Sequence, residues 1–161
     1  MDQSLVSRLF DRGMIEQAFP LVSTRIPGMT LDRWTRFALS HAGSRAGDWP
    51  RGLMAVQNPA GYILGMFAFE VREHLHEGRV LCVENVIVPN LPGRDMIWGV
   101  VVSEIEHLAT MNGCRAVFSD LPCERDSDDG DDTAWVTPVL ERSGYMLTSG
   151  RAFKRVRNRT V

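Results

Sequence analysis

The stretch VIVPNLPGRDMIWGVVVSEIEHLATMNGC, residues 86–114, decides the fold class of this chain. The apolar run that ends at residue 89 predicts a strand, and the Pro- and Gly-containing residues after it predict a short loop. The apolar spacing of residues 95–112 predicts an amphipathic helix that ends at Gly113. A strand, a short loop and a helix N-terminus in this order form a common setting for binding a phosphate group.

The loop departs from the usual composition of a phosphate site. Glycine is favoured there because it lets the backbone N–H groups of the helix N-terminus approach the phosphate closely. Here Met96 and Trp98 add bulk and Asp95 adds a negative charge, so that Arg94 is the one side chain that favours an anion. In the structural alternative, Asp95 caps the helix and the two large side chains pack in the core. The sequence leaves both interpretations open.

Hydrophobic periodicity predicts the order β, α, α, β, β, β, α, β, α, β along the rest of the chain. The predicted strands are 4–10, 52–57, 62–71, 79–89, 114–122 and 145–156, the last as a strand or hairpin, and the predicted helices are 14–26, 31–43, 95–112 and 133–144. Pro20 is expected near the first turn of its helix, and Thr30 is expected to cap the next one. A strand meander followed by helical crossovers predicts a mixed sheet with helices on both faces.

Composition bounds the class of protein. With 161 residues, 44% of them hydrophobic, the chain is predicted to form a single domain over 1–161. A net charge of −2 gives no bulk attraction to nucleic acid or to a membrane, and the basic segment 151–160 is expected to be an exposed strand edge. The three cysteines lack metal-binding spacing, so no metal site is predicted. Free thiols and the absence of a signal-peptide pattern favour a cytoplasmic protein.

The element order resembles the GNAT superfamily, the acyl-CoA-dependent N-acyltransferases. The resemblance covers nearly the whole chain and rests on LCVENVIVP (81–89), IWGVVVSEIEHLATMNGC (97–114) and VLERSGY (139–145). It implies an α/β (α+β) fold: a GNAT-like mixed, mostly antiparallel twisted sheet with helices on both faces. It also implies a splayed central pair of parallel strands, 82–89 and 115–121. The ungapped match places Met96 and Trp98 where the family has two glycines.

The resemblance implies an N-acetyltransferase that moves an acetyl group from acetyl-CoA to a primary amine of a small molecule or peptide. Glu84 matches a glutamate that many members use as the general base, and we expect it to face the gap between the splayed strands. The matched cofactor-binding positions are Val86, Ile87 and Val88 beside the donor, Gly93, Arg94, Asp95, Met96, Ile97 and Trp98 around its diphosphate, and Thr133 beside its pantetheine arm. The family also often forms homodimers.

Two further positions leave alternatives open. Glu84 is either a base whose apolar neighbours raise its pKa, or a partner for an arginine of a neighbouring strand. The tyrosine that often protonates the leaving thiolate in this family is replaced by Leu140, and Tyr145 matches an aromatic residue that usually packs in the core. The sequence therefore leaves a second class of function open besides an enzyme. In this alternative, the chain is a GNAT-shaped protein that no longer binds CoA and instead binds a ligand or a partner subunit.

Overall fold

The computed structural model describes residues 4–42, 50–120, 136–148 and 151–157. Its strands are β1 (Val6–Leu9), β2 (Arg51–Gln57), β3 (Ile63–His74), β4 (Gly78–Ile87), β5 (Ala116–Asp120), β6 (Met146–Thr148) and β7 (Arg151–Arg155). Its helices are α1 (Arg12–Arg25), α2 (Leu31–Ala42), α3 (Arg94–Met111) and α4 (Thr137–Arg142). The predicted element order is confirmed, and the last predicted strand is the β6–β7 hairpin.

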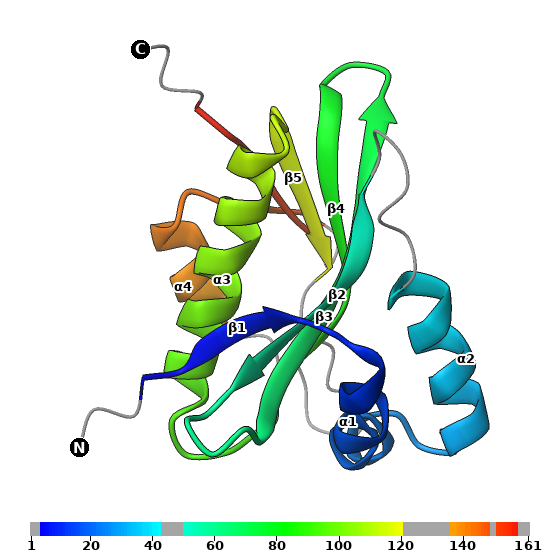
Figure 1. Ribbon diagram of the computed structural model, residues 1–161. Helices are drawn as coiled ribbons and strands as arrows, with labels where there is room; N and C mark the ends of the chain where they lie inside the picture. The colour runs from blue at the N-terminus through cyan, green and yellow to red at the C-terminus, as the bar shows by residue number, and fades with distance from the viewer. Residues whose placement is uncertain (1–3, 43–49, 121–135, 149–150, 158–161) are drawn as a thin grey trace.

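The described strands form one sheet in the order β1-β2-β3-β4-β5-β7-β6. Helices α1 and α2 lie against one face, and α3 and α4 lie against the other (Figure 1). Neighbouring strands run antiparallel except β4 and β5, which are parallel. This mixed, mostly antiparallel sheet between two helix layers confirms the predicted fold class. Because β7 lies between β5 and β6 over residues 151–153, the predicted strand edge is wrong for this part of the basic segment. Residues 154–155 pair with β5 alone, and residues 158–160 lie outside the described residues.

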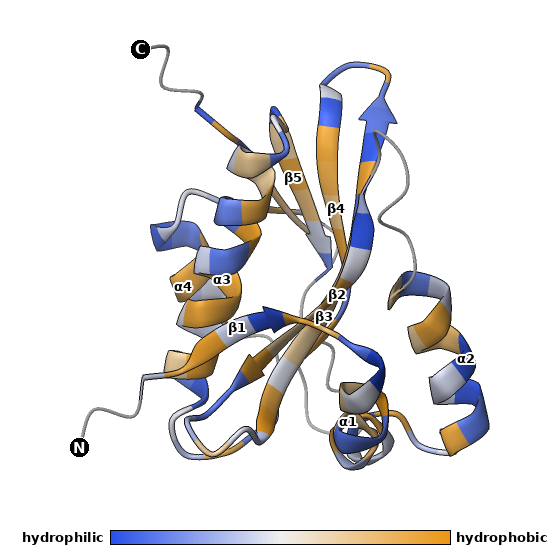
Figure 2. Cartoon of the chain, in the orientation of Figure 1, coloured by the Kyte–Doolittle hydropathy of each residue, from blue (hydrophilic) through white to orange (hydrophobic). Residues whose placement is uncertain are grey.

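The sheet separates two hydrophobic cores. Phe67, Val83 and Val117 belong to the core under α3, and Ala55, Met66 and Ala68 belong to the core under α1 and α2. Figure 2 shows apolar residues along β4 and β5, between the helix layers. Burial of apolar area on both faces is the main favourable term in folding, and it fixes which way each strand residue points.

Local signals fixed several element ends. The hydroxyl of Thr30 accepts a hydrogen bond from the backbone N–H of Arg33 at 3.2 Å, which confirms the predicted cap of α2. Gly113 has φ of 64° just after α3, a left-handed conformation that favours glycine and confirms the predicted helix end. The placement of Pro20 was wrong: α1 begins at Arg12, capped by Asp11, so Pro20 lies inside the helix. Pro20 is exposed there, and its carbonyl accepts a hydrogen bond from the Thr24 hydroxyl at 2.7 Å.

Candidate functional site

Strands β4 and β5 part at the centre of the sheet. Their parallel ladder joins Val80 to Ala116 and ends where Val83 pairs with Ser119. Beyond this point β4 continues to Ile87, whereas β5 ends at Asp120. The backbone groups of the last β4 residues therefore have no β5 partner in the described register. The predicted parallel pairing is confirmed, and the unpaired end of β4 leads directly into the loop before α3.

A bulge bends β4 at this end. Ala68 of β3 pairs with Glu84, but Met66, two residues earlier, pairs with Ile87, so β4 contains one extra residue. Asn85 has φ of 53°, a left-handed conformation in which asparagine is enriched. The extra residue shifts the alternation of side chains, so that Val86 packs in the α3 core and Ile87 packs in the core under α1.

Glu84 is the first β4 residue after the ladder with β5 ends. It pairs with Ala68 and therefore lies on the sheet face that carries α1 and α2. Its carboxylate lies 3.6 Å from the guanidinium of Arg72 on β3, and its side chain is 48% exposed. The expected shielding by apolar neighbours is wrong, because nearly half of the side chain reaches solvent. The expected arginine partner on a neighbouring strand is present.

The loop before α3 is held by its own side chains and backbone. Gly93 is the N-cap of α3, with φ of 86°, and makes no side-chain capping bond. Its carbonyl accepts hydrogen bonds from the backbone N–H groups of Met96 at 3.0 Å and Ile97 at 3.3 Å. The guanidinium of Arg94 donates a hydrogen bond to the Asn90 side chain at 2.8 Å. The alternative in which Asp95 caps the helix is wrong, because Asp95 lies within the first turn and the cap is Gly93.

The two large residues of this loop have opposite surroundings. Trp98 is 1% exposed and belongs to the α3 core, as the structural alternative predicted. Met96 is 57% exposed, so the same alternative is wrong for this residue. The helical geometry explains the difference, because residues two apart on a helix do not share a face. Of the two side chains, Met96 is the one that a ligand approaching the start of α3 from solvent would meet.

Arg25, at the C-terminus of α1, contacts the same region. Its guanidinium donates a hydrogen bond to the carbonyl oxygen of Val88 at 3.0 Å. Val88 is a residue whose backbone was predicted to lie beside the donor. This contact joins residues 63 apart in the chain. No sequence signal indicated it, because a long-range side-chain contact leaves no local periodicity.

The positions that the resemblance matched around the last helix differ in their placement. Thr133, predicted to lie beside the pantetheine arm, lies outside the described residues. Leu140 is 3% exposed and packs in the α3 core, together with Tyr145, which is 4% exposed. Among the described residues, the Tyr145 hydroxyl has no hydrogen-bond partner. Burial, and secondarily the charge of Glu106, raises the pKa of Tyr145. Its buried position fits the predicted packing role and opposes proton donation near neutral pH.

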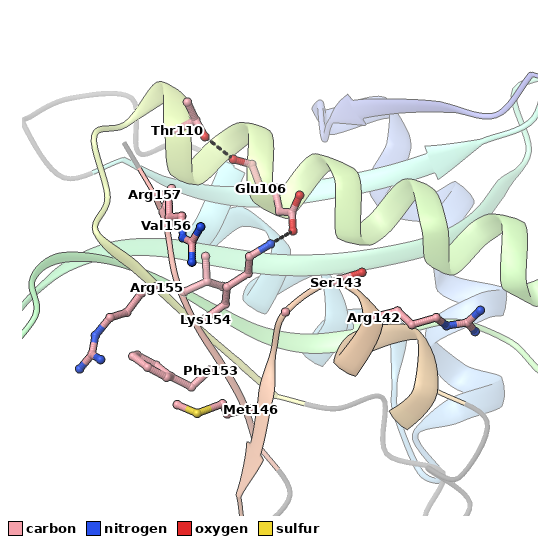
Figure 3. Close-up of a pocket in the computed structure, with 12 residues that line it drawn as sticks. Glu106, Thr110, Arg142, Ser143, Met146, Phe153, Lys154, Arg155, Val156 and Arg157 are labelled. Carbon is pink, nitrogen blue, oxygen red and sulfur yellow. Dashed lines mark hydrogen bonds and ion pairs between the residues drawn. The ribbon is translucent and has the colours of Figure 1, made fainter. Parts of the chain in front are cut away.

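Two surface grooves lie elsewhere on α3. The larger has a volume of about 1130 Å³ and lies beside the C-terminal half of α3, between that helix and β7. Across it Lys154 donates a hydrogen bond to Glu106 at 2.6 Å, and the arginines 142 and 155 point away from each other (Figure 3). The smaller groove lies between β1 and α3 and is lined by Met96, Gly99 and Val100. Neither groove includes Glu84 among its lining residues.

The described part of the chain has neither a metal-binding cluster nor a membrane-spanning helix. Within those residues, histidine, cysteine and acidic side chains form no cluster of three or more that could hold a metal ion. The helices of the same residues include none with the length and apolar character of a membrane span.

Comparison with solved structures identifies the fold. Aminoglycoside N-acetyltransferase AAC(6')-Iy in complex with CoA matches with a TM-score of 0.67 and 16% identity, over 99% of this chain and 97% of that one. AAC(6')-Ih from Acinetobacter baumannii matches with a TM-score of 0.64 and 12% identity, over 96% of both chains. Spermidine N-acetyltransferase SpeG from Vibrio cholerae matches with a TM-score of 0.64 and 13% identity, over 94% of this chain and 93% of that one.

This chain therefore has the fold of the GNAT acetyltransferases, and the resemblance seen in the sequence is confirmed at the level of the fold. No protein-family model matches the chain, and no curated protein sequence matches it. At identities of 9–16%, the solved structures establish the shared architecture, whereas the individual site residues stay predictions.

Proposed function

We propose that this protein is an N-acetyltransferase that transfers an acetyl group from acetyl-CoA to a primary amine. The observation that carries the proposal is the unpaired end of β4, which continues past the ladder with β5 and leads into the N-terminus of α3. The free backbone of the strand and the positive end of the helix dipole are the two features that an acyl-pantetheine arm and its diphosphate require. Solved structures of the same fold include acetyltransferases in complex with CoA.

The donor is proposed to lie along the backbone of Val86, Ile87 and Val88, with its diphosphate at the start of α3. Gly93 through Trp98 supply the N-terminal turn of that helix, and the guanidinium of Arg94 supplies a positive charge there. The fit rests on the backbone and on Arg94. Because the Trp98 ring is buried in the core, its bulk is directed away from solvent. The obstacles that remain are exposed Met96 and the negative charge of Asp95 in the first turn of α3.

Glu84 is proposed as the general base. The amine nitrogen attacks the thioester carbonyl, the C–N bond forms, and the C–S bond breaks to release the CoA thiolate. The proton lost by the amine passes to the Glu84 carboxylate, directly or through one water molecule. Because Glu84 is half exposed, it has room for that water. Leu140 has no ionisable group that could protonate the leaving thiolate, so the thiolate takes its proton from solvent.

Calorimetric titration with CoA, followed by an acetylation assay over a panel of primary amines, tests the proposal. Saturable CoA binding and amine-dependent release of free thiol are expected. No CoA binding at millimolar concentration would overturn the proposal and would leave the binding-module alternative. The acceptor is proposed to be a small molecule or a peptide, and the panel should include both.

A further inference from the structure

The groove beside the C-terminal half of α3 contains a strand edge that is open on one side. Strand β7 pairs with β5 along its whole length, Arg151–Arg155, whereas the first residue of β6, Met146, pairs with Phe153. Past Phe153, no other strand of the described residues continues the sheet on this side of β7. The groove, of about 1130 Å³, lies along this uncovered length, and residues 154–157 line it.

The direction of the backbone along this edge follows from one hydrogen bond. The N–H of Val156 donates to the carbonyl oxygen of Arg115, next to β5, at 2.7 Å, so Val156 directs its backbone groups towards β5. In an antiparallel pair, successive residues direct their backbone groups alternately towards the partner strand and away from it. Arg155 therefore directs its N–H and C=O away from β5, towards the groove that this residue lines. A strand added at a sheet edge pairs with such a donor and acceptor.

The side chains around the groove carry more positive than negative charge. Lys154 donates a hydrogen bond to Glu106 at 2.6 Å, across the groove (Figure 3). Arg155 forms an ion pair with a carboxylate of the β3–β4 turn at 2.9 Å. Arg142 and Arg157 also line the groove, and within the described residues neither of them forms an ion pair. Two cations at the groove are therefore left for a negatively charged ligand.

We propose that this groove is a docking site for an acidic peptide segment of a partner protein, which adds to the sheet as a strand beside β7. The open edge supplies hydrogen bonds to the peptide backbone, and Arg142 and Arg157 attract its acidic side chains. The groove includes neither Glu84 nor residues 93–98 among its lining residues, so this docking site does not rest on the proposed acetyl transfer.

The same observations argue against two other occupants. In a symmetric pairing of β7 with a second copy of itself, the basic residues 154–157 of the two copies would lie opposite each other. Like charges opposite each other across a strand pair are destabilising. A nucleic acid would use the positive charges, but it has no peptide groups to pair with the strand edge. The open edge therefore favours a peptide, and the two cations favour an acidic one.

The probe is a fluorescently labelled hexapeptide of alternating glutamate and valine with both ends blocked. Fluorescence anisotropy at low ionic strength should show that it binds the full-length protein saturably. A matched peptide with lysine in place of glutamate should bind at least about tenfold more weakly, because its charges are reversed. A glutamate peptide with every amide N-methylated should also bind at least about tenfold more weakly, because it keeps the charges but has no N–H groups for strand pairing.

Four variants locate the binding on the protein. Arg142→Gln and Arg157→Gln should each weaken binding by up to about fivefold, the range of an exposed ion pair. Arg36→Gln, on α2 and outside the groove, is the control and should leave the affinity unchanged. Arg155→Gln keeps the backbone N–H that is directed at the groove, whereas Arg155→Pro removes it. The proline variant should therefore bind about fivefold more weakly than the glutamine variant.

Hydrogen exchange followed by NMR tests the strand edge without any substitution, so the test holds even if Arg155→Pro does not fold. The glutamate peptide should slow exchange of the Arg155 N–H and leave the Val156 N–H, which is already bonded to Arg115, unchanged. Unchanged exchange at Arg155 would overturn strand addition. Equal binding of the three peptides, or equal binding of the N-methylated peptide and an oligonucleotide of the same charge, would overturn the acidic-peptide site. Slower exchange at Arg155 together with weak binding of both control peptides supports it.

Discussion

The guanidinium of Arg25 donates a hydrogen bond to the carbonyl oxygen of Val88 at 3.0 Å, and thereby joins the end of α1 to the end of β4. The contact lies where β4 has no β5 partner. It therefore helps to hold the end of β4 in place, as hydrogen bonds to a neighbouring strand do elsewhere in the sheet. A carbonyl oxygen can accept two hydrogen bonds, so this contact leaves a second position at Val88 for a bound donor.

Removing this contact should loosen the end of β4. The Arg25→Met change keeps most of the side-chain volume and should lower the free energy of unfolding by about 1 kcal/mol, the usual net value of a hydrogen bond. Urea denaturation at neutral pH measures this. Arg36→Met removes an arginine of α2 whose ion pair is exposed and should change stability by less than about 0.5 kcal/mol. Equal effects of the two changes would contradict the role given to Arg25.

The role of Glu84 gives a second prediction. Glu84→Gln should reduce the acetylation rate by roughly 10²–10⁴-fold, the range typical of losing a general base. Its stability should change little, because its ion pair with Arg72 is half exposed. Glu73→Gln, an exposed glutamate near the end of β3, is the matched control and should keep the native rate. A Glu84→Gln protein with the native rate would remove Glu84 from the mechanism.

Met96 gives a third prediction, because it is the exposed large residue at the start of α3. Met96→Gly should strengthen CoA binding about tenfold or more, because one recovered hydrogen bond to a charged group contributes about 1.5–3 kcal/mol. Calorimetry measures the affinity. Met111→Gly, at the other end of the same helix and 71% exposed, should leave CoA affinity unchanged. Unmutated protein that already binds CoA at micromolar concentration would show that Met96 is no obstacle.

Trp98 differs from Met96 in what its removal should do. The buried indole fills the α3 core, so Trp98→Ala should lower the free energy of unfolding by about 3–5 kcal/mol. Met96→Ala, at an exposed position, should change it by less than about 1 kcal/mol. Chemical denaturation of both variants compares the two values. Similar small effects would mean that Trp98 does not pack as the structure shows.

The Glu77–Arg155 pair gives a prediction for pH. Hydrogen bonds from Arg155, the shorter at 2.9 Å, lower the pKa of Glu77 below its ordinary value of 4.5. A carboxylate with a lowered folded-state pKa stabilises the protein fully above the unfolded-state pKa and loses that effect as pH falls through the folded-state value. The stability difference between native protein and Glu77→Gln should therefore be largest near pH 7 and vanish in acid below the lowered pKa. Denaturation curves from pH 7 to pH 3 measure it, and high salt should reduce it. A difference that grows in acid would contradict the pair.

The sequence determined the element order and the fold class, because these depend on local periodicity and on turn residues. Thr30 capped a helix and Gly113 ended one as predicted, since each signal acts within a few residues. The parallel pairing of β4 with β5 also followed from the order of the elements, because two strands joined by a helix usually pair in parallel through a right-handed crossover.

The tertiary structure decided what surrounds each site residue. Whether Met96 or Trp98 faces solvent depends on how α3 packs on the sheet. The sequence pattern did not distinguish the exposed residue from the buried one. The extra residue at Asn85 reverses the side-chain alternation at the end of β4, and no periodicity over so few residues could reveal it. The contacts of Arg72 with Glu84 and of Arg25 with Val88 join different elements, so they exist only once the sheet and its helices have packed.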